Sequence, residues 1–127
     1  MKTLKNIIKY LNLEDLNLLL TSSKKEVVDI VLEQLKYLSR YGKTEKISEE
    51  AFSLGKNKFS LEQLKYLSEY SKTDKISERA FNLGKDRFNL KQLEYLSEYG
   101  AIDKISKEAL KLLDKYKSTK FKIENYL

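Results

Sequence analysis

The sequence lacks residue types on which much protein chemistry depends. It contains no cysteine, no histidine and no proline among 127 residues. Without cysteine there are no disulfides and no thiolate zinc site, and nothing marks an oxidising compartment, so we expect an intracellular, cytoplasmic protein. The chain also has neither a glycine-rich phosphate loop nor an activated-nucleophile signature. We therefore expect no enzyme activity, no catalytic residues and no cofactor.

Long apolar runs are missing as well. Charged residues interrupt the first twenty positions at Lys2, Lys5, Lys9, Glu14 and Asp15. This pattern fits neither a signal-peptide core nor a membrane span. We expect no membrane partner.

Charge of one sign does not dominate the chain. The net charge is +6, but 19 acidic residues are interspersed with 25 basic ones. Mixed charge of this kind is typical of a solvated surface. The carboxylates of Glu49, Glu50, Asp74 and Asp86 have ordinary helix-surface spacings, which solvation explains. We expect no metal site.

A 29-residue unit is present three times. Residues 32–60 and 61–89 are identical at 21 of 29 positions, and residues 61–89 and 90–118 at 14 of 29. Such a period is typical of repeat proteins, whose units bury their apolar faces against their neighbours. We divide the chain into an N-terminal segment, three repeat units and a C-terminal tail, at 1–31, 32–118 and 119–127.

Each unit has two apolar faces with helical spacing, which predict a helix A and a helix B. The face of helix A is made of leucines three residues apart: Leu32, Leu35, Leu38; Leu61, Leu64, Leu67; Leu90, Leu93, Leu96. The face of helix B has spacings of four and three: Ile47, Ala51, Leu54; Ile76, Ala80, Leu83; Ile105, Ala109, Leu112. The sequence therefore predicts an all-α fold, a short α-solenoid of stacked helix pairs.

Capping residues locate the ends of these helices. Ser60 with Gln63, and Asn89 with Gln92, have capping-box spacing at the start of helix A. Two sets of residues compete as N-caps of helix B: Thr44, Thr73 and Asp103, or Ser48, Ser77 and Ser106. Helix B is expected to end on a left-handed glycine before a phenylalanine that leads into the next unit, at Gly55 with Phe59 and at Gly84 with Phe88.

The third unit departs from this pattern. Leu113 replaces the glycine and Lys117 the phenylalanine, so helix B is expected to run on with a polar outer side. The tail carries Phe121, Ile123, Tyr126 and Leu127. It either folds back over the last groove or frays.

The unit resembles an ankyrin repeat, in particular the divergent repeats of large DNA viruses and some bacterial proteins. The stretch from Ser48 to Gly55, then Phe59, then 61–67 (LEQLKYL) is similar to the first helix, short turn and second helix of that family. The period is 29 where the family standard is 33, and its threonine-proline-leucine-histidine signature is absent. The resemblance implies protein binding without catalysis, on an ankyrin-like fold with reduced β-turn fingers.

The N-terminal segment has a second resemblance, to an F-box. Residues 7–11 (IIKYL), then Asp15-Leu16 and Ser23-Lys24, are similar to the spacing of that motif, although its opening leucine-proline is missing. The resemblance implies docking to the adaptor of an SCF ubiquitin ligase. Residues 9–11 also match 36–38 (KYL), so the segment is alternatively a degenerate leading repeat that caps the stack.

One glutamine and two tyrosines recur in every unit without exception. They are Gln34, Tyr37, Tyr41; Gln63, Tyr66, Tyr70; and Gln92, Tyr95, Tyr99. Their spacing places each trio on one flank of helix A, away from the leucines. Tyrosine is enriched at the centres of protein interfaces, which makes this stripe the candidate binding surface. The alternative, which we favour, is that the tyrosines fill the seams between units.

Basic residues also recur in register and form a candidate basic edge: Lys43, Lys46, Lys72, Lys75, Lys104, Lys56, Lys58, Lys85 and Arg87. Such a ladder would bind phosphates while tyrosines stack on exposed bases. It is incomplete in the third unit, where Ala101 stands in place of Lys72 and Asp114 in place of Lys85.

We therefore expect a non-enzymatic protein-protein interaction module, as in a viral or phage effector or inhibitor that occupies a host protein. The alternatives are an F-box-type adaptor and a nucleic-acid-binding protein. The function follows from the fold only by analogy.

Overall fold

The structure, a computed structural model, describes residues 2–127 without the side chains of Lys2 and Phe121; Met1, where the predicted N-terminal segment starts, lies outside the described residues. The helices are α1 (Lys2–Ile7), the 3₁₀ helix η1 (Ile8–Tyr10), α2 (Leu13–Leu19), α3 (Lys25–Tyr41), α4 (Glu45–Gly55), α5 (Leu61–Glu69), α6 (Asp74–Gly84), α7 (Leu90–Tyr99) and α8 (Asp103–Glu124). Helix A of the three units is α3, α5 and α7, and helix B is α4, α6 and α8. Between residues 2 and 127 there is no strand, which confirms the all-α prediction.

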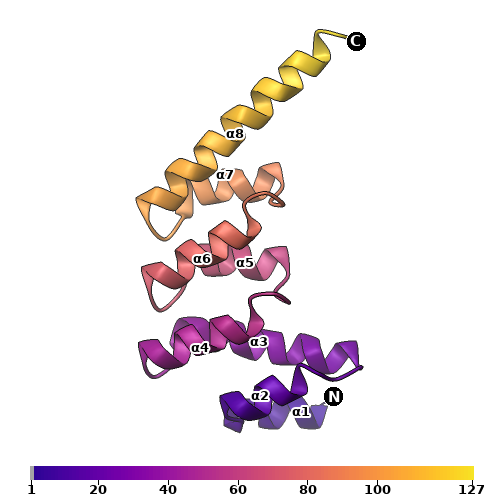
Figure 1. Cartoon of the computed structure of the whole chain (residues 1–127), viewed down its shortest axis with the longest axis vertical. Coiled ribbons are helices and arrows are strands. Elements are labelled where there is room, and N and C mark those ends of the chain that lie inside the picture. Colours follow the sequence, from indigo (N-terminus) through magenta and orange to yellow (C-terminus); the bar gives the residue numbers. More distant parts are fainter. Residues whose placement is uncertain (1) are drawn as a thin grey trace.

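Neighbouring helices form three closely packed pairs, α3–α4, α5–α6 and α7–α8. The pairs lie one above another, with α1 and α2 below α3–α4, while α8 projects beyond α7 at the far end (Figure 1). Contacts of α3 with α5 and of α5 with α7 join successive pairs. We call the contact of the first pair with the second the first junction, and that of the second with the third the second junction.

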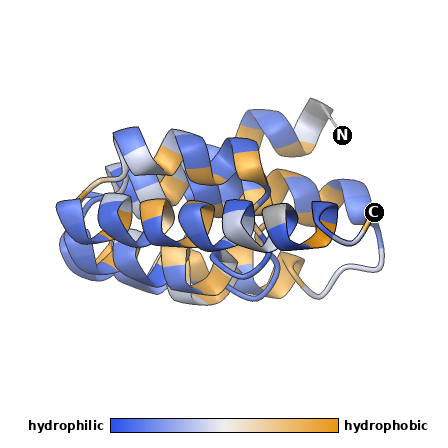
Figure 2. Ribbon diagram, turned by 90° about the horizontal axis from the view of Figure 1, so that it is seen from above, coloured by the Kyte–Doolittle hydropathy of each residue, from blue (hydrophilic) through white to orange (hydrophobic). Residues whose placement is uncertain are grey.

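The apolar faces predicted for both helices build one core, although Leu83 of helix B is 39% exposed and lies outside the cluster. Apolar and polar residues alternate along each helix, as the view down the stack shows (Figure 2). Leucines from helix A, isoleucines and alanines from helix B, and N-terminal residues belong to the same cluster: Leu35, Leu64, Leu96, Ala51, Ile76, Ala80, Ile105, Ala109, Ile8, Leu16 and Leu20. Each fully buried leucine contributes about 1.5–3 kcal/mol. The N-terminal helices are thus continuous with the repeats.

Two sets of side-chain hydrogen bonds hold the turn between helix A and helix B. The hydroxyls of Thr44 and Thr73 each accept the backbone N–H three residues on, at 3.2 Å. The serines further into helix B donate to the last carbonyls of helix A: Ser48 to Leu38 at 2.7 Å, Ser77 to Leu67 at 2.7 Å and Ser106 to Leu96 at 3.1 Å. In the first two units the threonines are therefore the N-caps, and the serines tie the helices of each pair together.

The glycines at the end of helix B do not act as predicted. No glycine among the described residues has a positive φ, and α4 and α6 include Gly55 and Gly84 as their last residues. Their role is steric, because a Cβ on Gly55 would lie 2.5 Å from the ring atom Cζ of Phe59, and one on Gly84 would meet Phe88 in the same way. The prediction of a left-handed ending was wrong; the glycine makes room for the aromatic ring.

The third unit lacks this glycine–phenylalanine contact. Leu113 is buried in the glycine position, and Lys117 is exposed in the phenylalanine position. With no ring to accommodate, α8 continues to Glu124, across the predicted boundary of the tail at residue 119. Ile123, Tyr126 and Leu127 are exposed, so they do not fold back over the stack; the side chain of Phe121 lies outside the described residues.

Backbone hydrogen bonds also link the units. The N–H of Lys72, in the turn after α5, donates to the carbonyl of Ser39 in α3 at 2.9 Å. The N–H of Ala101, in the turn after α7, donates to Ser68 in α5, also at 2.9 Å. These bonds fix the register of each helix A on the next and hold the helix flank that carries the tyrosines.

Candidate functional site: the tyrosine ladder

The six repeated tyrosines lie along α3, α5 and α7, two in each unit, and we call them the tyrosine ladder; Tyr70 directly follows the last residue of α5. In each pair the rings pack together, with centroids 5.0, 5.4 and 4.8 Å apart for Tyr37–Tyr41, Tyr66–Tyr70 and Tyr95–Tyr99. Four are exposed, Tyr37 by 53%, Tyr41 by 51%, Tyr70 by 39% and Tyr99 by 53%. Tyr66 and Tyr95 are half-buried. The ladder therefore combines both predicted locations, since two rings lie in seams and four reach solvent.

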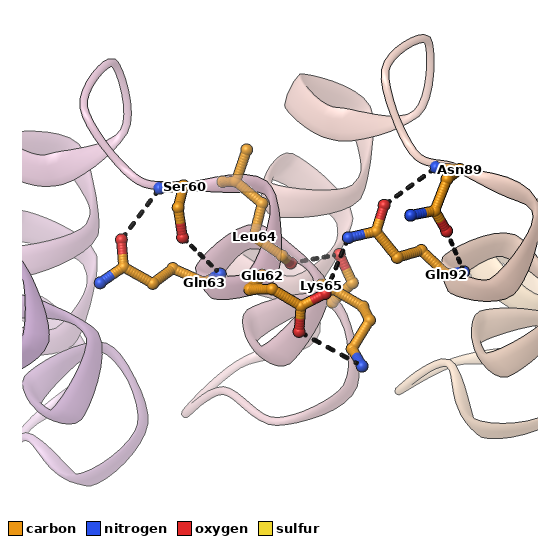
Figure 3. Close-up of polar contacts among 8 residues, drawn as sticks. Ser60, Glu62, Gln63, Leu64, Lys65, Asn89 and Gln92 are labelled. Carbon is orange, nitrogen blue, oxygen red and sulfur yellow. Dashed lines mark hydrogen bonds and ion pairs between the residues drawn. The ribbon is translucent and has the colours of Figure 1, made fainter.

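The repeated glutamines have a structural role in the second and third units (Figure 3). Gln63 with Ser60, and Gln92 with Asn89, form the predicted capping boxes at the starts of α5 and α7. The Gln63 amide also donates to Glu33 of the preceding unit at 2.9 Å. The Gln92 amide donates to Glu62 at 2.8 Å, and Gln92 is only 7% exposed. These two glutamines join the units. Gln34, by contrast, lies in the middle of α3 and is half-buried.

A lysine from the preceding unit covers each seam tyrosine. The Lys36 ammonium lies 4.7 Å from the ring centroid of Tyr66, and the Lys65 ammonium lies 4.4 Å from that of Tyr95. Each lysine is paired within its own helix, Lys36 with Glu33 at 2.9 Å and Lys65 with Glu62 at 3.6 Å. Cation–π contacts of this kind contribute about 0.5–1 kcal/mol at exposed sites.

The first junction holds a guanidinium among three tyrosines, and we call Arg40, Tyr41, Tyr66 and Tyr70 the Arg40 cluster. The guanidinium carbon lies 4.7, 5.7 and 4.2 Å from the ring centroids of Tyr41, Tyr66 and Tyr70. Its Nη1 donates to the Tyr66 hydroxyl at 2.7 Å. One side chain of the first unit thereby orders two tyrosines of the second.

The second junction has a glutamate at the equivalent position, and we call Glu69, Tyr70, Tyr95 and Tyr99 the Glu69 cluster. Hydrogen bonding to the Glu69 carboxylate is the main cause that raises the pKa of Tyr95 to about 12, with desolvation next. The same carboxylate raises the pKa of Tyr70. Both effects follow from an anion that accepts from a phenol and so favours its neutral form. A surface groove is lined by Glu69, Tyr70 and Tyr95.

The predicted basic edge is divided between the two ends of the helix pairs. Lys43, Lys46, Lys72, Lys75 and Lys104 belong to the turns from helix A to helix B and the following first residues, whereas Lys56, Lys58, Lys85 and Arg87 belong to the connections back to helix A. These turns and connections lie on opposite sides of the stack (Figure 1). Two members are paired with carboxylates, Lys104 with Glu78 at 2.6 Å and Lys85 with Glu108 at 4.0 Å. The structure does not bring these residues together.

Charges of both signs are distributed over the three repeat units. By sequence, the three units carry net charges of +2, +1 and +1. The groove between α2, α4 and α6 contains Glu49 and Glu50 together with Lys75 and Arg79, so charges of both signs face each other. Among the residues that the structure describes, no group of three or more potential ligands gathers to hold a metal ion. Nor is any described helix both long and apolar enough to span a bilayer.

Sequence reasoning missed the residues that contact the tyrosines. Arg40 and Glu69 were not among the candidates, although they occupy the same place in units that are otherwise nearly identical. A charge that changes sign at one position of an otherwise repeated sequence was the signal that could have identified these two residues. Comparisons with protein-family models, with curated proteins and with solved structures find no match to this chain.

Proposed function

We propose that the chain is a non-enzymatic protein-binding module whose contact surface is the tyrosine ladder. The observation that carries the proposal is the set of four exposed tyrosines, Tyr37, Tyr41, Tyr70 and Tyr99, repeated along helix A of three consecutive units. A tyrosine ring supplies a large apolar face with a polar tip and loses little conformational entropy on binding, which suits protein interfaces.

The packing around the ladder supports the proposal, because it preorganises the rings. Each exposed tyrosine packs against a ring of its own unit, and Tyr66 and Tyr95 are in turn held by side chains of the preceding unit. A surface that is ordered before binding loses less freedom when a partner arrives. The backbone bonds across both junctions add to this rigidity.

Binding to nucleic acid is the less supported alternative. Phosphate recognition requires a continuous basic groove, whereas the basic residues here are divided between opposite sides of the stack. Lys36 and Lys65, which lie next to the tyrosines, are each paired with a glutamate. Ile8, Leu16 and Leu20 of the N-terminal segment are buried in the common core. This burial favours a segment that caps the stack over an F-box.

The test is selection from a displayed library of random peptides on the immobilised chain. Enriched peptides are then measured on a ladder variant with Tyr37→Ser, Tyr41→Ser and Tyr99→Ser. We expect the affinity to fall at least about tenfold, the usual effect of removing interface tyrosines. A matched variant replaces three tyrosines outside the ladder, Tyr10, Tyr116 and Tyr126, which are also exposed. This control variant should bind as the wild type does.

The proposal is wrong if no peptide is enriched, or if both variants bind equally well. A labelled single-stranded oligonucleotide, measured at low and high salt, separates the alternative. Tight binding that weakens steeply with salt and survives the ladder substitutions would favour nucleic acid through the lysines.

A further inference from the structure

At both junctions three tyrosines at equivalent positions of the repeat surround a charged residue, and the sign of that charge differs. Positions 29 residues apart are equivalent, so Tyr41, Tyr66 and Tyr70 of the Arg40 cluster correspond to Tyr70, Tyr95 and Tyr99 of the Glu69 cluster. Arg40 itself corresponds to Glu69. The first cluster thus holds a guanidinium at this position and the second holds a carboxylate, while Arg40 also covers Tyr70, the ring that the two clusters share.

The Arg40 cluster shows which chemical group such an arrangement holds. Its guanidinium lies within 6 Å of three ring centroids and donates to one phenol oxygen. The Lys36 ammonium also lies over the Tyr66 ring, so this ring contacts both a lysine and the Arg40 guanidinium. Arginine suits this environment because its planar, weakly hydrated cation stacks on aromatic faces.

The Glu69 cluster retains these features and adds a carboxylate. The rings of Tyr95 and Tyr99 pack at 4.8 Å, and Lys65 lies on Tyr95 as Lys36 lies on Tyr66. Among the charged residues that line the groove, Lys36 is paired with Glu33 and Lys65 with Glu62, and Glu69 is the remaining one. The groove lined by Glu69, Tyr70 and Tyr95 opens to the surface. A carboxylate beside aromatic faces attracts a cation both through the rings and through a charge-assisted hydrogen bond.

We propose that the Glu69 cluster binds the guanidinium of an arginine side chain supplied by a protein partner. The guanidinium would donate to the Glu69 carboxylate and stack against Tyr99, the counterpart of the Tyr70 ring that Arg40 covers. This inference rests on the proposed function and names the group that the tyrosine ladder recognises. Arginine is chosen over lysine because the equivalent cluster already holds a guanidinium.

The direct test uses N-acetyl-arginine methylamide as the probe and NMR of the protein labelled on its tyrosine rings. We expect concentration-dependent shifts of Tyr70, Tyr95 and Tyr99, and none of Tyr37. N-acetyl-citrulline methylamide, which has the same shape and no charge, should cause no shift. The lysine analogue should bind more weakly than the arginine probe; equal or tighter binding would overturn the choice of arginine.

Three variants examine the site from within the repeat. Glu69→Arg should fill the second cluster with an internal guanidinium and abolish the probe shifts, while Glu69→Gln should weaken binding about fivefold. Arg40→Glu should create a second site, with new shifts of Tyr41 and Tyr66. Glu50→Arg is the matched control, because it makes the same charge change at an exposed residue of α4 that belongs to neither tyrosine cluster. This variant should bind the probe as the wild type does.

Circular dichroism confirms that each variant is folded before binding is compared. The inference is overturned if the folded wild type shows no shift with the arginine probe, or if Glu69→Arg binds it equally well. The peptide selection separates the two proposals: enriched peptides without arginine that still require the ladder would refute the Glu69 site alone. Failure to enrich any peptide would refute the proposed function.

Discussion

At the first junction Gln63 donates to Glu33, Lys36 covers Tyr66, and the N–H of Lys72 donates to α3. At the second junction the residues one unit later make the same three contacts. The difference lies beside the tyrosines, where the guanidinium of the first junction is replaced by the carboxylate of the second. The repeated contacts hold the units together. The position of Arg40 and Glu69 does not take part in them, so its charge can differ between units while the helix pairs still stack.

This comparison separates positions that stabilise the stack from those that define its surface. Substitution of a residue that makes one of the repeated contacts should therefore lower the free energy of unfolding to the same extent at both junctions. Substitution of Arg40 or Glu69 should change binding more than folding.

The largest effect is expected for the phenylalanines that lead into α5 and α7. Phe59 stacks on Phe52 at 5.9 Å and Phe88 packs on Phe81 at 6.1 Å, and both leading rings are buried. Phe59→Ala and Phe88→Ala should each lower the free energy of unfolding by about 3–5 kcal/mol, because each leaves a cavity. Urea denaturation measures this loss. Tyr10→Ala, at an exposed ring, is the control and should cost under about 0.5 kcal/mol. A clear inequality between the two phenylalanines would contradict equivalent junctions.

Next in size is the effect of adding a methyl group to the glycines. Alanine is a better helix former than glycine by about 1 kcal/mol, so propensity alone predicts stabilisation. Because a Cβ on Gly55 would overlap the Phe59 ring, we expect Gly55→Ala to destabilise instead, by about 1–3 kcal/mol, and Gly84→Ala likewise. Thermal unfolding decides the sign. Ser53→Ala, on the exposed side of α4, should change stability by less than about 0.5 kcal/mol.

These glycines show where prediction from the sequence ends. The period and the leucine spacing predicted the helix faces, and the Ser60 and Asn89 motifs predicted capping boxes that are present. The local rule for Gly55 failed because the deciding contact is with an aromatic ring four residues later, whose direction depends on the next helix.

The candidate site was predicted only in part for a related reason. The repeated tyrosines were found from the sequence because identical residues recur in register. Their partners Arg40 and Glu69 differ from unit to unit and contact rings of the following unit. Which residues meet across a junction depends on how neighbouring helices pack, and the pattern of a single unit does not contain that information.

A smaller effect is expected at the glutamines. Gln63→Ala and Gln92→Ala each remove half of a capping box and one hydrogen bond to the preceding unit, so each should lower stability by about 1–2 kcal/mol. Gln34 is the matched control, since it lies nine residues inside α3. Gln34→Ala should cost less than about 0.5 kcal/mol in urea denaturation. If Gln34→Ala lowered stability as much as the other two substitutions, the capping boxes and the bonds between units would not explain why the glutamine recurs.

The smallest effect concerns only the second junction and appears at high pH. The pKa of Tyr95 is raised from 10.0 to about 12, mainly by Glu69, so the folded state retains a proton that the unfolded chain releases above pH 10. The unfolded state therefore binds fewer protons between pH 10 and 12, and stability should fall as the pH rises through this window. Tyrosinate absorbance should show a ring that titrates near pH 12, Tyr95, beside Tyr70, whose pKa the same carboxylate also raises.

Tyr95→Phe should remove this late titration and flatten the loss of stability between pH 10 and 12. Glu69→Gln should lower the pKa of Tyr95 toward its ordinary value, because the main cause of its elevation is gone. Tyr66→Phe is the matched variant at the first junction, where the phenol accepts a hydrogen bond from Arg40. If Tyr66→Phe removed the late titration instead, the charge difference between the junctions would not govern these phenols.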